Sequence, residues 1–136
     1  MYNEQPRTSR IINYSMSQEL KELLFKDLCS RLPYDTKVYC QNEIDWFDDE
    51  IGTAIISACI NDEYIVKPYL FPISSMNEKQ REEYLSTGAR VEVCGIENVW
   101  IPGLETFDWL NKNHFDYRGL IKMGLAIDAT SLNVYC

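Results

Sequence analysis

Leucines recur at helical spacing between residues 20 and 32, and this spacing constrains the fold more than any other feature of the chain. The residues concerned are Leu20, Leu23, Leu24, Leu28 and Leu32. Positions three and four apart lie on one face of an α-helix, so these side chains form one apolar stripe that requires burial. Ser15 and Gln18 match the capping box that opens a helix, and Pro33 stops it. The pattern predicts an N-terminal amphipathic helix packed against a core.

Two segments have the residue types that are typical of β-strands. Residues 37–41 are rich in strand-forming side chains. Residues 90–96 alternate with a period of two, so that Val91 and Val93 share one face. We expect both segments to be strands.

Two further segments are predicted to be extended. The apolar run over residues 52–60 is expected to be a longer strand, and after a turn at residues 61–62 the alternating residues 63–66 return antiparallel to it as a hairpin. Residues 68–72 begin and end with proline, which has no N–H to give to a sheet ladder. This last segment is therefore expected at a sheet edge or as an extended connection.

The second half of the chain contains signals for three short helices. A capping box over residues 75–78 opens a polar helix over residues 79–86, which ends at Gly88. Residues 106–113 predict an aromatic helix, and Asp116 opens a helix that runs to Met123.

This order of elements predicts an α+β fold. With 136 residues, of which 46% are hydrophobic, the chain buries a core without disulfides or metals. We expect one domain over residues 1–136, with residues 1–14 as a loose N-terminal arm. The expected architecture is a small antiparallel sheet packed against the leucine helix, and the same strands arranged as a partly open barrel are the alternative.

The cysteines indicate a reducing compartment. They are Cys29, Cys40, Cys59, Cys94 and Cys136. Their number is odd and no two have the C-x-x-C spacing, so reduced thiols are the simplest interpretation. No apolar stretch reaches the roughly 20 residues that cross a bilayer, and the N-terminus lacks a secretory layout. We therefore expect a cytoplasmic protein without a membrane span.

The negative charge of the chain is concentrated in one segment. The formal net charge is −8, and residues 43–63 contain seven acidic side chains and no lysine or arginine. Because nucleic acids bind to cationic faces, direct nucleic-acid binding is disfavoured. A basic protein surface is the expected partner, since complementary charges steer encounter. The alternative is a solvated loop that keeps the protein soluble.

Two adjacent aromatic residues lie inside this acidic segment. Trp46 and Phe47 are either buried or serve as anchors for a partner, because interfaces use exposed aromatic side chains. The predicted partner-binding residues are Asp45, Trp46, Phe47, Asp48, Asp49 and Glu50.

The single histidine, His114, is the candidate for catalysis. Asp116 would orient its ring, and a cysteine or carboxylate distant in the sequence would act with it. The alternative is a histidine that caps or packs at the end of a helix. Arg118 is expected to have a structural role and to pair with Asp116 or Asp108.

No metal and no cofactor are expected from the motifs of this chain. The carboxylates of Asp45, Asp48 and Asp49 do not have the spacing of a Ca²⁺ loop. The six glycines are scattered and form no phosphate-binding loop.

Three blocks of sequence occur together in this chain: DLCSRLPY at 27–34, KPYLFPISSM at 67–76 and WLNKNHFDYRGLI at 109–121. In this order they resemble a family of short uncharacterised proteins from gut bacteria and their phages. The resemblance spans roughly residues 18–128 and implies a phage or mobile-element context, without an assigned activity. The chain departs from the family at residues 128–136, where a short acidic tail is expected.

These observations favour a non-enzymatic protein-binding accessory protein that acts on a host factor through its acidic surface. Two alternatives stay open. One is a small hydrolase or transferase that uses His114 with a cysteine or a carboxylate. The other is a protein that binds a small ligand, such as a nucleotide or a metabolite.

Overall fold

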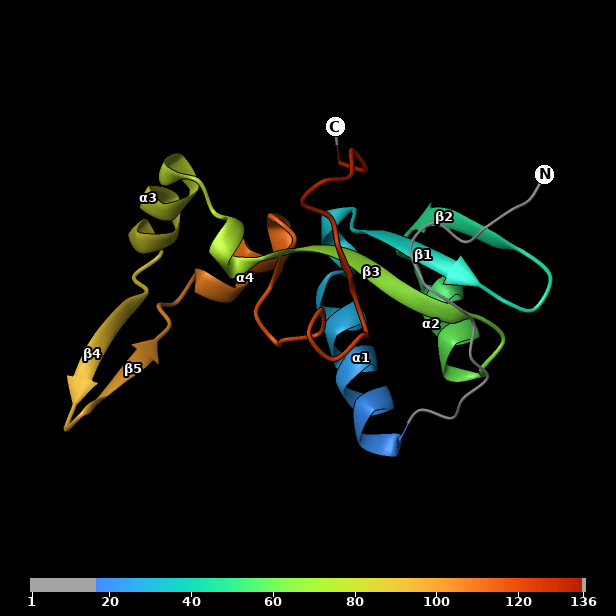
Figure 1. Ribbon diagram of the computed structural model, residues 1–136, viewed down its shortest axis with the longest axis horizontal. Helices are drawn as coiled ribbons and strands as arrows, with labels where there is room; N and C mark the ends of the chain where they lie inside the picture. The colour runs from blue at the N-terminus through green and yellow to red at the C-terminus, as the bar shows by residue number, and fades with distance from the viewer. Residues whose placement is uncertain (1–16, 136) are drawn as a thin grey trace.

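Helices and strands alternate along residues 17–135, the part of the chain that the computed structural model describes (Figure 1). The helices are α1 (Gln18–Ser30), α2 (Thr53–Ile60), α3 (Glu78–Ser86) and α4 (Thr106–Lys112). The strands are β1 (Lys37–Gln41), β2 (Trp46–Glu50), β3 (Ile65–Pro72), β4 (Arg90–Cys94), β5 (Glu97–Ile101), β6 (Phe115–Asp116) and β7 (Ile127–Asp128). The α+β class is confirmed, and these strands do not close into a barrel.

The main sheet has five strands and is mixed. Its order is β2-β1-β3-β6, and β7 also pairs with β3. β1 is antiparallel to β2 and β3, whereas β6 and β7 are parallel to β3. The predicted sheet was antiparallel throughout, but α3, α4 and the hairpin β4–β5 lie between β3 and β6, and such a long crossover allows a parallel return.

β3 lies at the centre of the sheet, so the prediction of an edge position for residues 68–72 is wrong. Pro68 forms the last pair of the ladder with β1, opposite Val38. Pro72 forms the last pair of the ladder with β6, opposite Asp116. Each proline therefore stands at the end of a ladder, where the missing N–H removes the fewest hydrogen bonds.

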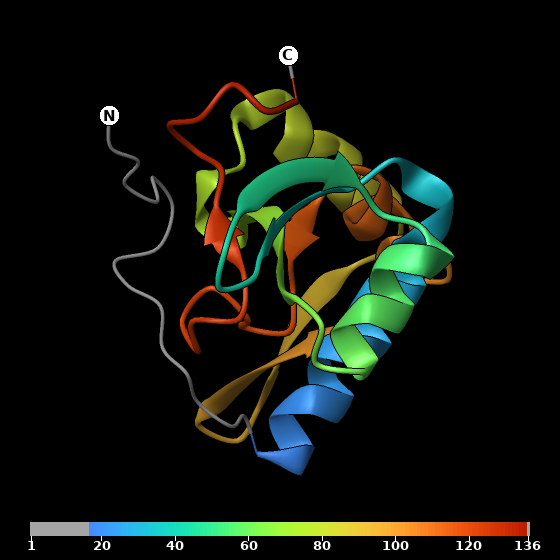
Figure 2. The ribbon, with the colours of Figure 1, turned by 90° about the vertical axis from the view of Figure 1, so that its right-hand side faces the viewer.

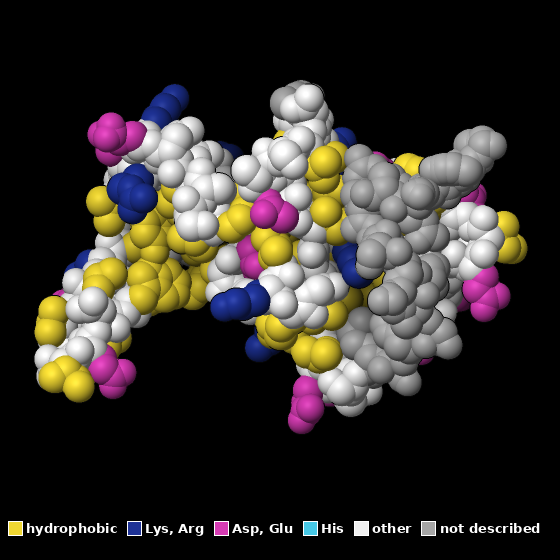
Figure 3. Space-filling model, in the orientation of Figure 1, with side chains coloured by type: hydrophobic (Ala, Val, Ile, Leu, Met, Phe, Trp, Pro, Cys, Tyr) yellow, Lys and Arg dark blue, Asp and Glu magenta, His cyan; other side chains and the backbone are white. Residues whose placement is uncertain are grey.

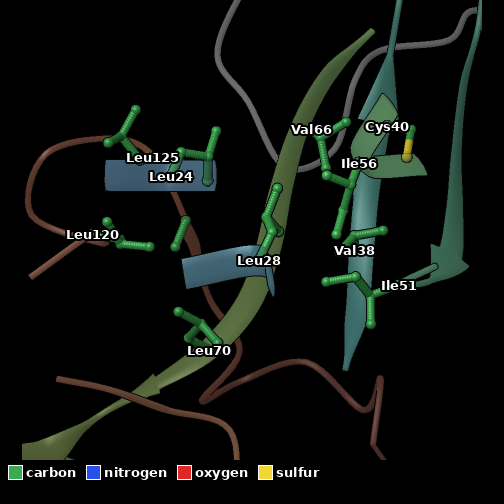
Figure 4. Packing of buried hydrophobic residues seen from close by; sticks show 11 residues of the cluster. Leu24, Leu28, Val38, Cys40, Ile51, Ile56, Val66, Leu70, Leu120 and Leu125 are labelled. Atoms are coloured by element: carbon green, nitrogen blue, oxygen red, sulfur yellow. The ribbon is translucent and has the colours of Figure 1, made fainter. Parts of the chain in front are cut away.

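The leucine stripe of α1 is buried, as predicted. Leu24 and Leu28 pack against Val38 of β1 and Leu70 of β3, and Ile56 of α2 joins the same cluster (Figure 4). The remaining leucines of the stripe are partly buried against this cluster. α1 and α2 thus cover one face of the sheet (Figure 2).

The C-terminal segment contributes to a second cluster, on the opposite face of the sheet. Tyr39 and Tyr69 alternate with the helix-facing residues of β1 and β3, and they pack with Ile127 and Ala129. Tyr135 is partly buried against the same cluster.

The apolar run at residues 52–60 forms the helix α2 and not the predicted strand. A continuous apolar run does not distinguish the two structures by its periodicity. Gly52, in an extended conformation, is the N-cap of this helix. The predicted hairpin with residues 63–66 is consequently absent, and the start of β3 pairs with β1 instead.

The predicted helix over residues 116–123 is also wrong. Asp116 lies in β6, and both oxygens of its carboxylate accept hydrogen bonds from the N–H groups of Leu120 and Ile121, each at 2.9 Å. Gly119 has a φ of 76° and Gly124 a φ of 77°. A left-handed residue in the middle of the segment interrupts a right-handed helix, so the chain forms turns here.

The other two helices of the second half are confirmed, with one cap displaced. α3 begins after Asn77, whose side chain forms a capping box with Gln80, two residues later than predicted.

The N-cap of α1 is Ser17, which accepts the N–H of Leu20 at 3.2 Å. The predicted cap Ser15 lies outside the described residues.

Candidate functional site

A fully buried ion pair lies at the C-terminal end of α1. Arg31 Nε is 2.9 Å from Asp27 Oδ2, and Arg31 Nη2 is 3.0 Å from Oδ1 of the same carboxylate. Both side chains have no exposed surface. Arg31 Nη2 also donates to the carbonyl oxygen of Phe115 at 2.8 Å, which joins α1 to β6.

Arg118 forms a second ion pair with the same Asp27 carboxylate. Its Nη1 donates to Asp27 Oδ1 at 2.7 Å, so the predicted pairing with Asp116 or Asp108 is wrong. The ring of Tyr117 lies 4.7 Å from the Arg118 guanidinium carbon and 5.3 Å from that of Arg31. One carboxylate thus pairs with two guanidinium groups that also contact an aromatic face, which is a structural network.

His114 directly follows Asn113, the C-cap of the helix α4. Its φ of 64° is left-handed, which is the usual conformation of the residue that follows a helix cap. Its Nδ1 is 3.3 Å from Thr36 Oγ1. Its ring stacks on Tyr135, with centroids 3.9 Å apart and an angle of 10° between the planes. These contacts agree with the predicted packing role at the end of a helix, and the side-chain contacts described are to Thr36 and Tyr135.

The surroundings of His114 keep its ring neutral. Burial, with a smaller contribution from the positive charge of Arg31, lowers the pKa of His114 to about 4. An imidazole with this pKa is uncharged at neutral pH.

Protonation of His114 is expected to destabilise the fold as the pH decreases. Because the pKa is about 4 in the folded protein and about 6.5 in an unfolded chain, the unfolded state binds the proton first. The stability is complete above pH 6.5 and decreases toward pH 4, and this one group accounts for about 2 kcal/mol between pH 7 and pH 5. Urea unfolding over this range, on the wild type and on His114→Asn, measures the effect.

Asparagine is the suitable replacement because it tolerates the left-handed conformation and does not titrate. The carboxylates titrate in both proteins, so the difference between the two pH profiles isolates His114. Parallel profiles would show that His114 does not titrate as described.

Asp116 does not orient His114. Its two oxygens accept the N–H groups of Leu120 and Ile121, as described above, whereas His114 contacts Thr36 and Tyr135. Within residues 17–135 the predicted histidine–aspartate pair is therefore not formed.

The cysteines with perturbed thiols are poor nucleophiles. Burial raises the pKa of Cys40 to about 12 and that of Cys59 to about 11, so both are protonated at neutral pH. Cys29 and Cys94 are also free thiols, and Cys136 lies outside the described residues.

Part of the acidic segment, residues 46–50, forms the strand β2, whereas Glu43 and Asp45 lie in the turn before it and Asp62 and Glu63 in the turn after α2. β2 pairs with β1 over its whole length, from Lys37 opposite Glu50 to Gln41 opposite Trp46. Asp45, in the turn before β2, is exposed. Within β2 the side chains of Asp48, Asp49 and Glu50 are also exposed.

The two aromatic side chains of β2 are half-buried and point to opposite faces of the sheet. Trp46 packs on Tyr39 with ring centroids 5.8 Å apart, and Phe47 meets Tyr64 edge-on at 5.4 Å. Trp46 belongs to the cluster of the C-terminal segment and Phe47 to that of the helices. These residues fix β2 to both cores, so their main contacts are internal.

Some of the acidic groups of this segment have local partners. Asp48 Oδ1 accepts the hydroxyl of Tyr69 at 2.5 Å, and Glu50 is 3.4 Å from Lys37 Nζ. The Asp45 and Asp49 carboxylates each accept the N–H of the following residue at 2.8 Å. Short hydrogen bonds thus set the positions of the Asp45, Asp48 and Asp49 carboxylates, and Glu50 is placed by the strand and by its longer contact with Lys37.

The sequence interpretation missed a second exposed feature, the hairpin of β4 and β5. We call residues 90–101 the arm, because they project from the body at one end of the molecule (Figure 1). The signal was present: Gly95 and Ile96 separate two strand-like segments, and a glycine at the first position of a two-residue loop is typical of a hairpin. Only the first strand was predicted.

Other classes of site receive no support from the described residues. In residues 17–135 no three His, Cys, Asp or Glu side chains converge as a metal ion requires. Among the helices of the same residues, none is long and apolar enough to cross a membrane.

Comparison with known proteins adds no further constraint. No protein-family model, curated protein or solved structure matches the chain.

Proposed function

We propose that this protein is a non-enzymatic protein-binding protein that receives a basic partner on its acidic strand. One observation carries the proposal: the acidic side chains of β2 are displayed on a strand that Trp46 and Phe47 fix to both cores. A partner therefore meets charges that are already ordered, which reduces the entropy lost on binding.

The environment of His114 supports the non-enzymatic part of the proposal. Its ring is stacked under Tyr135 and its pKa is far below neutral pH. Asp116 is engaged in a turn, and burial keeps Cys40 and Cys59 protonated. No observation favours the small-ligand alternative, since the aromatic rings near His114 pack on one another.

The biological setting is proposed from the resemblance described above. In a phage or mobile-element context, an acidic protein that occupies the basic surface of a host factor would block or redirect that factor. We also propose a cytoplasmic location, where such a host factor is accessible.

Removal of the charges should abolish partner binding without unfolding the protein. In the variant Asp45→Asn/Asp48→Asn/Asp49→Asn, each amide keeps the oxygen that accepts the hydrogen bonds at its site. The wild type and this variant are each immobilised as bait, and quantitative mass spectrometry identifies the basic proteins that each retains. The variant should lose a basic protein that the wild type retains. Association of the retained partner should slow first, because steering charges act on the association rate.

A control variant with the same loss of charge separates this surface from net charge. Glu78, Glu82 and Asp108 are exposed on α3 and α4, away from β2. The variant Glu78→Gln/Glu82→Gln/Asp108→Asn should bind like the wild type. If both triple variants lose the partner equally, or neither does, the acidic strand is not the recognition surface.

A further inference from the structure

The arm has one apolar face and one mixed face. Val91 is opposite Trp100, and Val93 is opposite Asn98. Residues directly opposite each other lie on the same face of a hairpin, so Val91, Val93 and Trp100 share one face. Arg90, Glu92 and Val99 belong to the other face.

The valines of the apolar face are uncovered within the described chain, whereas Trp100 at its base is 40% exposed and contacts Tyr84 and Phe107. All residues of β4 are exposed, and in β5 only Ile101 is partly buried. Hydrophobic side chains accordingly gather on the surface of the arm (Figure 3). A two-stranded hairpin is marginally stable in water unless its apolar face packs against something.

Contacts at the base of the arm fix its direction relative to the body. Thr87 Oγ1 is 2.8 Å from Thr106 Oγ1, which also accepts the N–H of Gly103 at 2.7 Å. A Cβ atom on Gly103 would lie 2.1 Å from the carbonyl oxygen of Thr87, so the two ends of the hairpin touch through glycine backbone. Trp100 further donates its indole N–H to the Tyr84 hydroxyl and meets Phe107 edge-on at 5.7 Å.

The charge distribution favours a second copy over a charged partner on this face. The arm holds one basic residue, Arg90, and two acidic residues, Glu92 and Glu97, which gives −1 of the total of −8. Two arms therefore meet with little repulsion. The acidic strand β2 lies toward the opposite end of the molecule, so the acidic surfaces of two copies stay apart (Figure 1).

The exposed area of the arm approaches the size that a symmetric pair requires. The exposed parts of Val91, Val93 and Trp100, together with Ile96 in the turn at the tip of the arm, amount to on the order of 500 Å², within the range of the largest apolar patches on monomers. Two copies would together cover on the order of 1,000 Å² before any polar rim is added, close to the ~1,200 Å² at which specific interfaces begin.

We infer that the arm is a dimerisation element, which packs its apolar face against the same face of a second copy about a two-fold axis. Such an interface is isologous, because each Val93 contributes to the same surface in both copies. This interface is separate from the acidic strand and does not depend on the proposed basic partner.

Sedimentation velocity across a range of protein concentrations tests the inference. The wild type should shift from 15.9 kDa toward twice that mass as the concentration rises. Val93→Lys should weaken the dimer at least about 10-fold in Kd, because the lysine places a charge in the centre of the apolar face. Its far-ultraviolet circular dichroism spectrum should stay that of the wild type, since the Val93 side chain is 72% exposed.

Val99→Lys is the matched control. Val99 lies on the other face of the same hairpin, opposite Glu92, and should accept lysine without loss of dimer. A wild type that is monomeric up to about 100 μM, or equal weakening by both substitutions, would overturn the inference.

A second measurement needs no variant. Amide hydrogens of residues 91–100 should exchange more slowly at high than at low concentration of the wild type, whereas those of β2 should not change. Exchange that is independent of concentration throughout the arm would also overturn the inference.

Added salt should leave this dimer intact but weaken binding of a basic partner, so failure of one proposal is recognised separately from failure of the other.

Discussion

Asp27→Ala is expected to lower the free energy of unfolding by about 3–5 kcal/mol, the usual cost of removing one partner from a buried ion pair. The carboxylate of Asp27 accepts hydrogen bonds from two guanidinium groups, those of Arg31 and Arg118, at distances of 2.7 to 3.0 Å. Without it, the Arg31 side chain, which has no exposed surface, is left charged and without its counter-ion. Urea unfolding followed by tryptophan fluorescence measures the loss.

The control is a short arginine–carboxylate ion pair that is exposed to solvent. Arg90 Nε is 2.6 Å from a Glu92 carboxylate oxygen, but about half of each side chain is exposed. Water screens this pair, so Glu92→Ala should cost only about 0–1 kcal/mol. If the two alanine variants were equally stable, burial of the Asp27 network would not be what makes it important.

Leu24→Ala is expected to cost about 2–5 kcal/mol, the range for truncation of a buried leucine that leaves a cavity. The Leu24 side chain is 1% exposed and lies in the cluster that joins α1 and α2 to the sheet (Figure 4). The surrounding side chains come from several elements, which limits how far the cavity collapses. Thermal and urea unfolding of the variant give the change.

Leu85→Ala makes the same chemical change at a helical position that is 54% exposed. It removes much less buried apolar surface and should cost under about 1 kcal/mol. An unchanged melting temperature for Leu24→Ala, or an equal decrease for both variants, would show that the leucine stripe is not the core of the fold.

The sequence by itself determined the elements whose signals are local. The leucine spacing determined α1 and its buried face, the strand-forming residue types determined β1, and alternation determined the first strand of the arm. The helices α3 and α4 followed from their capping and aromatic patterns. In each case neighbouring residues carry the information, because a helix or a strand brings residues two to four positions apart onto one face.

The tertiary structure decided what depends on residues far apart in the chain. The run at residues 52–60 fits a buried strand or a helix equally well, and packing against α1 and β3 selects the helix. The pairing of Arg118 with Asp27 joins positions 91 residues apart, so no local pattern predicts it. The central place of β3 depends on where β6 and β7 return.

The candidate surfaces divide in the same way. Charge counting identified the acidic residues 45–50, but only the pairing with β1 shows that they lie on a strand fixed by Trp46 and Phe47. Alternation indicated that Val91 and Val93 share a face, which usually means burial. Only the fold shows that both valines are exposed, because burial is a property of what packs against a strand and not of the strand itself.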